Sequence, residues 1–205
     1  MGLYERYVLP KMIDLACSSR PTRKQREKVV PRAEGEVLEV GMGSGLNLPF
    51  YDRAKVRKVW GLEPSAGMRK LARRNRGGAD LALEMIDLPG EEIPLGTDSI
   101  DTVLLTYTLC TIPDALLALR GMRRVLRPGG RLLFCEHGLA PDPDVARWQN
   151  RINPAWRVVA GGCNLNRDIP ALLGSAGFRI LDEERMYVPG VRALNSNYWG
   201  SAVAD

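Results

Sequence analysis

Short apolar runs that alternate with helix-like stretches are the feature that most restricts the fold of this chain. The runs occupy residues 36–40, 56–63, 79–86, 99–108 and 131–137, and two further strand-like segments occupy 177–188 and 194–204. Helical patterns lie between them at 65–76 and 112–126. Short buried strands that alternate with helices are typical of a mostly parallel sheet covered on both faces. We therefore expect an α/β fold, with the last two strands joined as a hairpin at one edge.

The 205 residues favour a single domain, in which residues 1–30 form a helical cover and residues 31–205 form the sheet domain. No apolar run approaches the roughly 20 residues of a membrane span, and residues 1–20 lack the order of a signal peptide. The four cysteines are scattered without a close pair, which argues against a zinc site and a disulfide framework. We expect a cytoplasmic protein that holds no metal.

The net charge of +5 comes largely from two basic stretches, at 20–28 and 68–76. Aromatic residues do not interleave with these charges, so no stacking platform for nucleic acid is predicted. Solvated helix faces are the favoured interpretation, and peripheral contact with an anionic membrane is the other. The sequence says little about the oligomeric state.

Three glycines follow the first apolar run directly, in the stretch VLEVGMGSGLNLPF. In an open α/β sheet, ligands bind beyond the carboxyl ends of the strands, where Gly41, Gly43 and Gly45 would lie. Glycine takes positive φ and lets a ligand approach the backbone closely. Glu63 ends the next strand, where a carboxylate can accept hydrogen bonds from both hydroxyls of a ribose. The spacing is not the dinucleotide one, so the pattern predicts another ligand that contains a ribose.

The segments LEVGMGSG, GLEPSAGM and RVLRPGGRLLF resemble the motifs of class I S-adenosylmethionine-dependent methyltransferases with a type 11 (UbiE-like) domain. The resemblance implies a Rossmann-like seven-stranded, mostly parallel sheet in the order 3-2-1-4-5-7-6, with strand seven antiparallel and helices on both faces. It implies S-adenosylmethionine as the cofactor and S-adenosylhomocysteine as the product. The glycines would pass the methionine part of the cofactor, Glu39 would orient its amino end, and Glu63 would hold the ribose.

The aspartate with which many family members bind adenine has no counterpart here, because the matching position lies close to Pro89. Backbone near Leu88 and packing by Pro64 and Met68 are expected instead. The predicted cofactor-binding residues are Glu39, Gly41, Met42, Gly43, Gly45, Asn47, Glu63, Pro64, Met68, Leu88 and Thr106.

Five segments in the second half, TYTLCTIPD, CEHG, NPAW, GGCNLNRD and NYWGSAV, resemble the thiol S-methyltransferase branch, the methyltransferase-like seven proteins of microsomes. This resemblance implies methyl transfer to a small lipophilic acceptor, most simply a thiol. Related methyltransferases act on phospholipid amines or quinones, so N-methylation of a phospholipid amine is the alternative. A catalytically silent cofactor- or partner-binding protein remains the non-enzyme alternative, because a fold does not determine a function.

His137 is the single histidine of the chain and follows the fifth apolar run. It is a candidate general base or substrate-orienting group, or else a loop histidine that fixes the turn at Gly138. Tyr107 ends the fourth run and is the second catalytic candidate, or else a buried ring with a paired hydroxyl.

The candidate substrate residues lie between the fifth run and the terminal hairpin and are Trp156, Cys163 and Asn164. The alternative is that the tryptophan fills core. Cys110 and Cys163 have no histidine close in sequence, so both are interpreted as buried or pocket-lining residues and not as nucleophiles.

Overall fold

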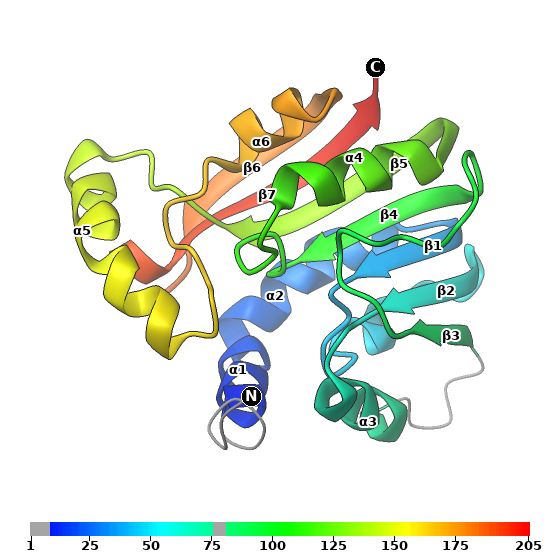
Figure 1. The fold of residues 1–205 in the computed structure, drawn as a ribbon, viewed down its shortest axis with the longest axis horizontal. Helices are drawn as coiled ribbons and strands as arrows, with labels where there is room; N and C mark the ends of the chain where they lie inside the picture. The colour runs from blue at the N-terminus through cyan, green and yellow to red at the C-terminus, as the bar shows by residue number, and fades with distance from the viewer. Residues whose placement is uncertain (1–8, 76–80) are drawn as a thin grey trace.

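A seven-stranded sheet in the order β3-β2-β1-β4-β5-β7-β6 forms the centre of the protein, which confirms the expected strand order (Figure 1). The computed structural model describes residues 9–75 and 81–205. The strands are β1 (Gly35–Val40), β2 (Val56–Leu62), β3 (Ala82–Ile86), β4 (Ile100–Thr106), β5 (Leu126–His137), β6 (Phe178–Tyr187) and β7 (Ser196–Ala204). Neighbours from β3 to β5 are parallel, whereas β7 runs antiparallel to both β5 and β6.

Helices cover the two faces of the sheet. The helices of the described residues are α1 (Leu9–Cys17), α2 (Arg20–Val29), α3 (Ala66–Asn75), α4 (Ala115–Val125), α5 (Pro143–Val159) and α6 (Ile169–Ser175), with short 3-10 turns η2 (Val30–Arg32), η3 (Leu48–Phe50) and η4 (Arg192–Leu194). Buried residues of α4 and α6 pack on one face, and those of α2 and α3 pack on the other. No helix within the described ranges is both long and apolar enough to cross a membrane.

The central strands are apolar at consecutive positions because both of their faces are buried. In β4, Val103 and Leu105 belong to the core under α4, whereas Leu104 belongs to the core under α2. Successive side chains of a strand point to opposite faces, so each face receives every second residue. This explains why the strands were visible in the sequence as continuous apolar runs and not as alternating patterns.

One strand begins earlier than the sequence indicates. The fifth apolar run covers residues 131–137, but β5 begins at Leu126. The register with β4 jumps here, since Ile100 lies opposite Leu126 and Thr102 lies opposite Arg131. Gly129 has a φ of +81°, which lets the extra residues bulge out of the ladder.

The carboxyl ends of β1, β2, β4 and β5 meet on one side of the sheet, and α1 lies beyond them (Figure 1). The helical cover expected for residues 1–30 corresponds to α1 and α2, and α2 packs against β5 and β7. Residues 1–8 lie outside the described part of the chain. The division of the chain into this cover and a sheet domain of residues 31–205 stays a prediction. Helix α5 projects away from the sheet and leads into the loop that returns to α6 (Figure 1).

Candidate active site

The glycine loop after β1 is held in a conformation that favours glycine at three positions. Gly41, Gly43 and Gly45 have φ angles of +69°, +58° and +79°. A Cβ on Gly41 would lie 2.1 Å from Thr108 Cγ2, so packing excludes a side chain there. A Cβ on Gly43 would meet nothing nearer than a backbone oxygen at 3.9 Å. The space beside Gly43 is therefore open to a ligand that lies against the backbone.

Glu63 fixes this loop from the end of β2. Its Oε2 accepts a hydrogen bond from the Gly43 N–H at 2.9 Å, and its Oε1 accepts one from the Ser65 N–H at 2.8 Å. Burial raises the pKa of the Glu63 carboxyl, although these two hydrogen bonds lower it. A carboxylate offers about four acceptor positions. Two therefore remain, which suits the two hydroxyls of a ribose.

Glu39 is buried behind the loop with two side-chain donors. Asn47 Nδ2 donates to Glu39 Oε1 at 2.9 Å, and the Tyr51 hydroxyl donates to Oε2 at 2.6 Å. Burial nevertheless raises the pKa of Glu39 to about 7. Asn47 Oδ1 is buried without a hydrogen-bond partner among the described residues. A protonated amino group would supply both a donor for Asn47 and a positive charge for Glu39, so this corner fits the amino end of S-adenosylmethionine.

A cavity of about 70 Å³ lies between the glycine loop, the end of β4 and the two N-terminal helices. The predicted cofactor and catalytic residues that line it are Gly41, Met42, Gly43, Asn47, Met68, Thr106 and Tyr107. Glu39, Gly45 and Glu63 do not line it and instead support its wall. Pro64 is exposed and Leu88 packs against the core under α4, so neither belongs to the cavity as it stands.

The N-terminal helices supply cavity residues that the sequence did not reveal. Asp14 of α1 accepts a hydrogen bond from the Ser44 hydroxyl, and Cys17 also lines the cavity. Arg26 of α2 is buried, donates to the Cys17 carbonyl at 2.5 Å and leaves its Nε without a partner among the described residues. Its guanidinium suits a ligand carboxylate. A signal was present, because Arg26 shares the helical spacing of the buried Val29 and Val30.

Tyr107 has an unusual backbone at the end of β4. Its φ is +56°, which is an outlier for a bulky residue and a conformation that concentrates at functional sites. The hydroxyl donates to Asn197 Oδ1 at 2.8 Å, and the ring lies 5.1 Å from the Arg26 guanidinium carbon. Burial raises the pKa of Tyr107 well above its usual range, so the hydroxyl stays protonated. This geometry suits a cavity wall better than a base.

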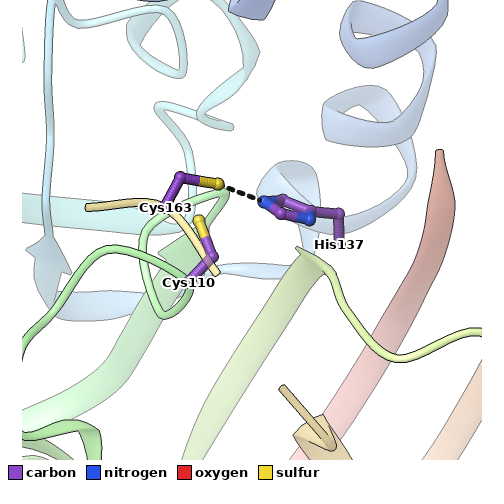
Figure 2. A group of neighbouring side chains, drawn as sticks. All are labelled: Cys110, His137 and Cys163. Carbon is purple, nitrogen blue, oxygen red and sulfur yellow. Dashed lines mark hydrogen bonds between the residues drawn. The ribbon is translucent and has the colours of Figure 1, made fainter. Parts of the chain in front are cut away.

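Cys110, His137 and Cys163 come together from three separate segments (Figure 2). Cys163 Sγ lies 3.2 Å from His137 Nε2, and the two sulfurs and a ring nitrogen lie within 4.8 Å of one another. The scattered spacing of the cysteines argued against a zinc site, and it gave no sign that two of them would lie beside the single histidine. The reason is topological: the loops after β4 and α5 meet at the end of β5, where His137 lies.

Hydrogen bonding fixes the cluster and polarises it. Asn164 anchors the loop of Cys163, because its backbone N–H and its Nδ2 each donate to the Cys110 carbonyl at 2.9 Å. The pKa of Cys163 is lowered most by the Cys110 thiol and next by His137, and Trp156 of α5 lowers it as well. Burial lowers the pKa of His137, but Cys163 more than offsets this and raises it. The predicted catalytic histidine and all three predicted substrate residues thus lie in one group.

Comparison with known proteins gives the same class as the fold. The methyltransferase domain family matches residues 38–134. The chain is 34% identical over 163 residues to the thiol S-methyltransferase TMT1B of Homo sapiens, an alignment that covers 77% of the chain and 66% of the human protein. It is 29% identical over 136 residues to the phosphatidylethanolamine N-methyltransferase of Cereibacter sphaeroides, covering 65% and 66% of the two chains.

A solved structure of an S-adenosylmethionine-dependent methyltransferase from Thermotoga maritima superposes with a TM-score of 0.70 at 20% identity, over 98% of each chain. At this identity the likeness shows the fold, which agrees with the strand order. The chain belongs to the S-adenosylmethionine-dependent methyltransferases of class I, and S-adenosylmethionine is its cofactor. Within that class it is similar to the thiol S-methyltransferases, of whose human members it spans about two thirds.

Proposed function

We propose that the protein transfers a methyl group from S-adenosylmethionine to the sulfur of a small lipophilic thiol. The observation that carries the reaction type is the pair of buried carboxylates, Glu39 and Glu63, at the ends of neighbouring strands around the glycine loop. Similarity to human thiol S-methyltransferases at 34% identity supports the thiol acceptor. Four free cysteines fit a reducing, cytoplasmic location, which is part of the proposal.

Each end of the cofactor has a proposed partner. Glu63 binds the ribose, Asn47 Oδ1 and Glu39 bind the amino group, and the buried Arg26 binds the carboxylate. Met68 packs on the adenine. Pro64 and the backbone at Leu88 also contact the adenine, once the segments that carry them move toward the cavity. When bound, S-adenosylmethionine supplies a methyl group already activated by its sulfonium. The chain contributes alignment and exclusion of water, and alignment supplies up to roughly 7–11 kcal/mol of a barrier.

The methyl acceptor must lose a proton before it can react. A free thiol has a pKa near 8.5, and only its thiolate is a good nucleophile. We propose that the acceptor lies between Tyr107 and the group formed by His137, Trp156, Cys163 and Asn164. There the apolar rings hold its carbon skeleton, and the surroundings of His137 favour loss of the thiol proton.

Direct turnover tests the proposal. Purified protein is incubated with S-adenosylmethionine and, separately, with alkyl thiols, aryl thiols, amines and phosphatidylethanolamine vesicles, and S-adenosylhomocysteine and methylated product are measured. The proposal expects thiol-dependent product that is lost in Glu63→Ala. Product from amines alone would contradict the thiol acceptor. Cofactor binding without turnover of any acceptor would favour a catalytically silent protein.

A phospholipid amine is the second candidate acceptor. Two observations favour it: the similarity to the bacterial phosphatidylethanolamine N-methyltransferase, and the exposure of Leu15 on α1, 75% accessible, beside the basic α2. An exposed apolar side chain next to basic residues is typical of contact with an anionic membrane. Co-sedimentation with anionic vesicles at low salt distinguishes the candidates, because a small-thiol enzyme remains in the supernatant.

A further inference from the structure

We propose that Cys110, His137 and Cys163 bind one Zn²⁺ ion and leave its fourth coordination position open to an exogenous ligand. Neither the family match nor the cofactor assignment includes this site. The proposal rests on the geometry of the three side chains, on their ligand chemistry and on the hydrogen bonds that fix their loops.

The spacing of the ligand atoms fits a tetrahedral ion. With Zn–S and Zn–N distances near 2.3 and 2.0 Å, two ligands of one tetrahedral zinc lie about 3.6 Å apart. Cys163 Sγ and His137 Nε2 are 3.2 Å apart, and all three candidate ligand atoms lie within 4.8 Å of one another. Side-chain shifts of up to about 1 Å would therefore bring all three ligand atoms to the tetrahedral spacing. The two sulfurs and the ring nitrogen already point toward a common centre (Figure 2).

The ligand set is chemically selective. Two thiolates and one imidazole are soft and borderline ligands, which favour Zn²⁺ over Mg²⁺ or Ca²⁺. Among the described residues, no fourth cysteine, histidine or carboxylate joins the group. Structural zinc sites are closed by four protein ligands, whereas sites with three protein ligands keep a position for water or substrate. The count of three thus indicates an open site.

The loops that carry the ligands are fixed by polar contacts beyond the cluster itself. Glu136 is fully buried, and its Oε1 accepts hydrogen bonds from the backbone N–H groups of Thr108 at 2.8 Å and Leu109 at 3.1 Å. Arg167 donates to the Leu109 carbonyl, and Asn164 joins the loops of Cys110 and Cys163. Such second contacts orient ligands at metal sites. Glu136 Oε2 has no hydrogen-bond partner among the described residues, and Glu136 directly precedes the proposed ligand His137.

The site adjoins the cavity. Cys110 Sγ lies 3.8 Å from the Tyr107 carbonyl, and Tyr107 lines the cavity wall. We infer that an acceptor thiol takes the fourth position, where it displaces water, releases its proton to solvent and binds as the thiolate. This part rests on the proposed function, whereas metal binding does not.

Metal binding by the reduced, tag-free full chain tests the site. Zn²⁺ is titrated in competition with a chromogenic chelator, and Co²⁺ is added separately as a spectroscopic probe. We expect one equivalent of Zn²⁺, release of protons on binding, and thiolate-to-cobalt charge-transfer bands with the visible bands of a tetrahedral ion. Loss of a residue that hydrogen-bonds to a metal ligand typically weakens metal binding roughly 10–100-fold. Cys163→Ser and Cys110→Ser each remove a ligand itself, so they should weaken Zn²⁺ binding by more than this.

Cys135→Ser is the matched control, because Cys135 is a buried cysteine on β5 that lies outside the cluster, and it should bind Zn²⁺ like the unmodified protein. Circular dichroism and S-adenosylhomocysteine binding check that each variant folds. Absence of stoichiometric uptake overturns the site, and so does uptake that Cys163→Ser leaves intact. The cobalt spectrum of the unmodified protein decides the matter even if a variant fails to fold.

The acceptor role has its own readout. An alkyl thiol added to the Co²⁺ protein without S-adenosylmethionine should shift the charge-transfer bands, whereas the matching alcohol should not. Unchanged bands would contradict binding of the acceptor thiol to the metal ion, but they would not contradict the metal site itself. Metal uptake together with a thiol shift, but without turnover of any thiol, would instead contradict the proposed function.

Discussion

Replacement of Glu63 by glutamine tests the proposed ribose contact most directly. In the structure, one carboxylate oxygen accepts from the Gly43 N–H and the other from the Ser65 N–H. Glutamine keeps one acceptor oxygen but places an NH₂ group against the second backbone donor. The substitution therefore weakens the support of the glycine loop and removes the charge that would strengthen both ribose hydrogen bonds.

The expected size follows from these contacts. A hydrogen bond to a charged group contributes about 1.5–3 kcal/mol, against about 1 kcal/mol for a neutral one. Loss of the charge at two ribose hydroxyls, with partial compensation by the remaining oxygen, should cost about 2–4 kcal/mol of binding free energy. At 1.4 kcal/mol for each tenfold change, the dissociation constant of S-adenosylhomocysteine should rise roughly 30- to 700-fold.

Isothermal titration calorimetry with S-adenosylhomocysteine measures this change. Glu84→Gln is the control: it removes the same charge on the adjacent strand β3, from an exposed carboxylate that pairs with Lys58 at 2.7 Å. The control should bind normally. A less than threefold effect in a folded Glu63→Gln protein would refute the ribose contact and with it the orientation proposed for the cofactor.

Three further predictions involve Glu39, the glycines Gly43 and Gly129, and Tyr107. Burial raises the pKa of Glu39 from 4.5 to about 7, so the folded state favours the protonated carboxyl. The stability that this protonated form contributes is full below about pH 4.5 and is lost as the pH rises through 7, a loss of about 3 kcal/mol. Urea unfolding of the cofactor-free protein should show this loss, and Glu39→Gln should abolish it. Gly43→Ala and Gly129→Ala both place a side chain at positive φ and should each cost about 1–2 kcal/mol in stability, but only Gly43→Ala should also weaken S-adenosylhomocysteine binding in calorimetry. Tyr107→Phe should lower stability by about 1–3 kcal/mol, because it leaves Asn197 Oδ1 unpaired, and should change the turnover number by less than tenfold; a larger loss of turnover would assign the hydroxyl a chemical role.

The parts of this fold that were predictable depend on local patterns. Strands such as β4 are buried on both faces, so their sequences are continuously apolar and easily found. The glycine loop and Glu63 follow consecutive strands, and the carboxyl ends of parallel strands meet at one edge. Their proximity therefore follows from the strand assignment alone.

The parts that were missed depend on contacts between segments far apart in sequence. Arg26 and Asp14 reach the cavity only because α1 and α2 dock beyond the strand ends, and helical periodicity does not say where a helix docks. His137 and Cys163 meet because the chain leaves the sheet through α5 and returns to the same edge. The positive φ of Tyr107 is imposed by its surroundings, and its residue type argues against it.

The position of α1 in the wall of the cavity has a consequence for the rate at which the protein can work. A space of about 70 Å³ is much smaller than the roughly 300–1,000 Å³ of pockets that hold ligands of this size, so we expect α1, which supplies Asp14 and Cys17 to the wall, to move when the methionine end of the cofactor enters or leaves. Only Ser18 and Ser19 separate α1 from α2, so such a motion would have to break the hydrogen bonds that hold this link, including that from Arg26 to the Cys17 carbonyl. When such a motion limits product release, it sets the turnover number. Solvent viscosity would then slow catalysis, whereas the reactivity of the acceptor would hardly affect it.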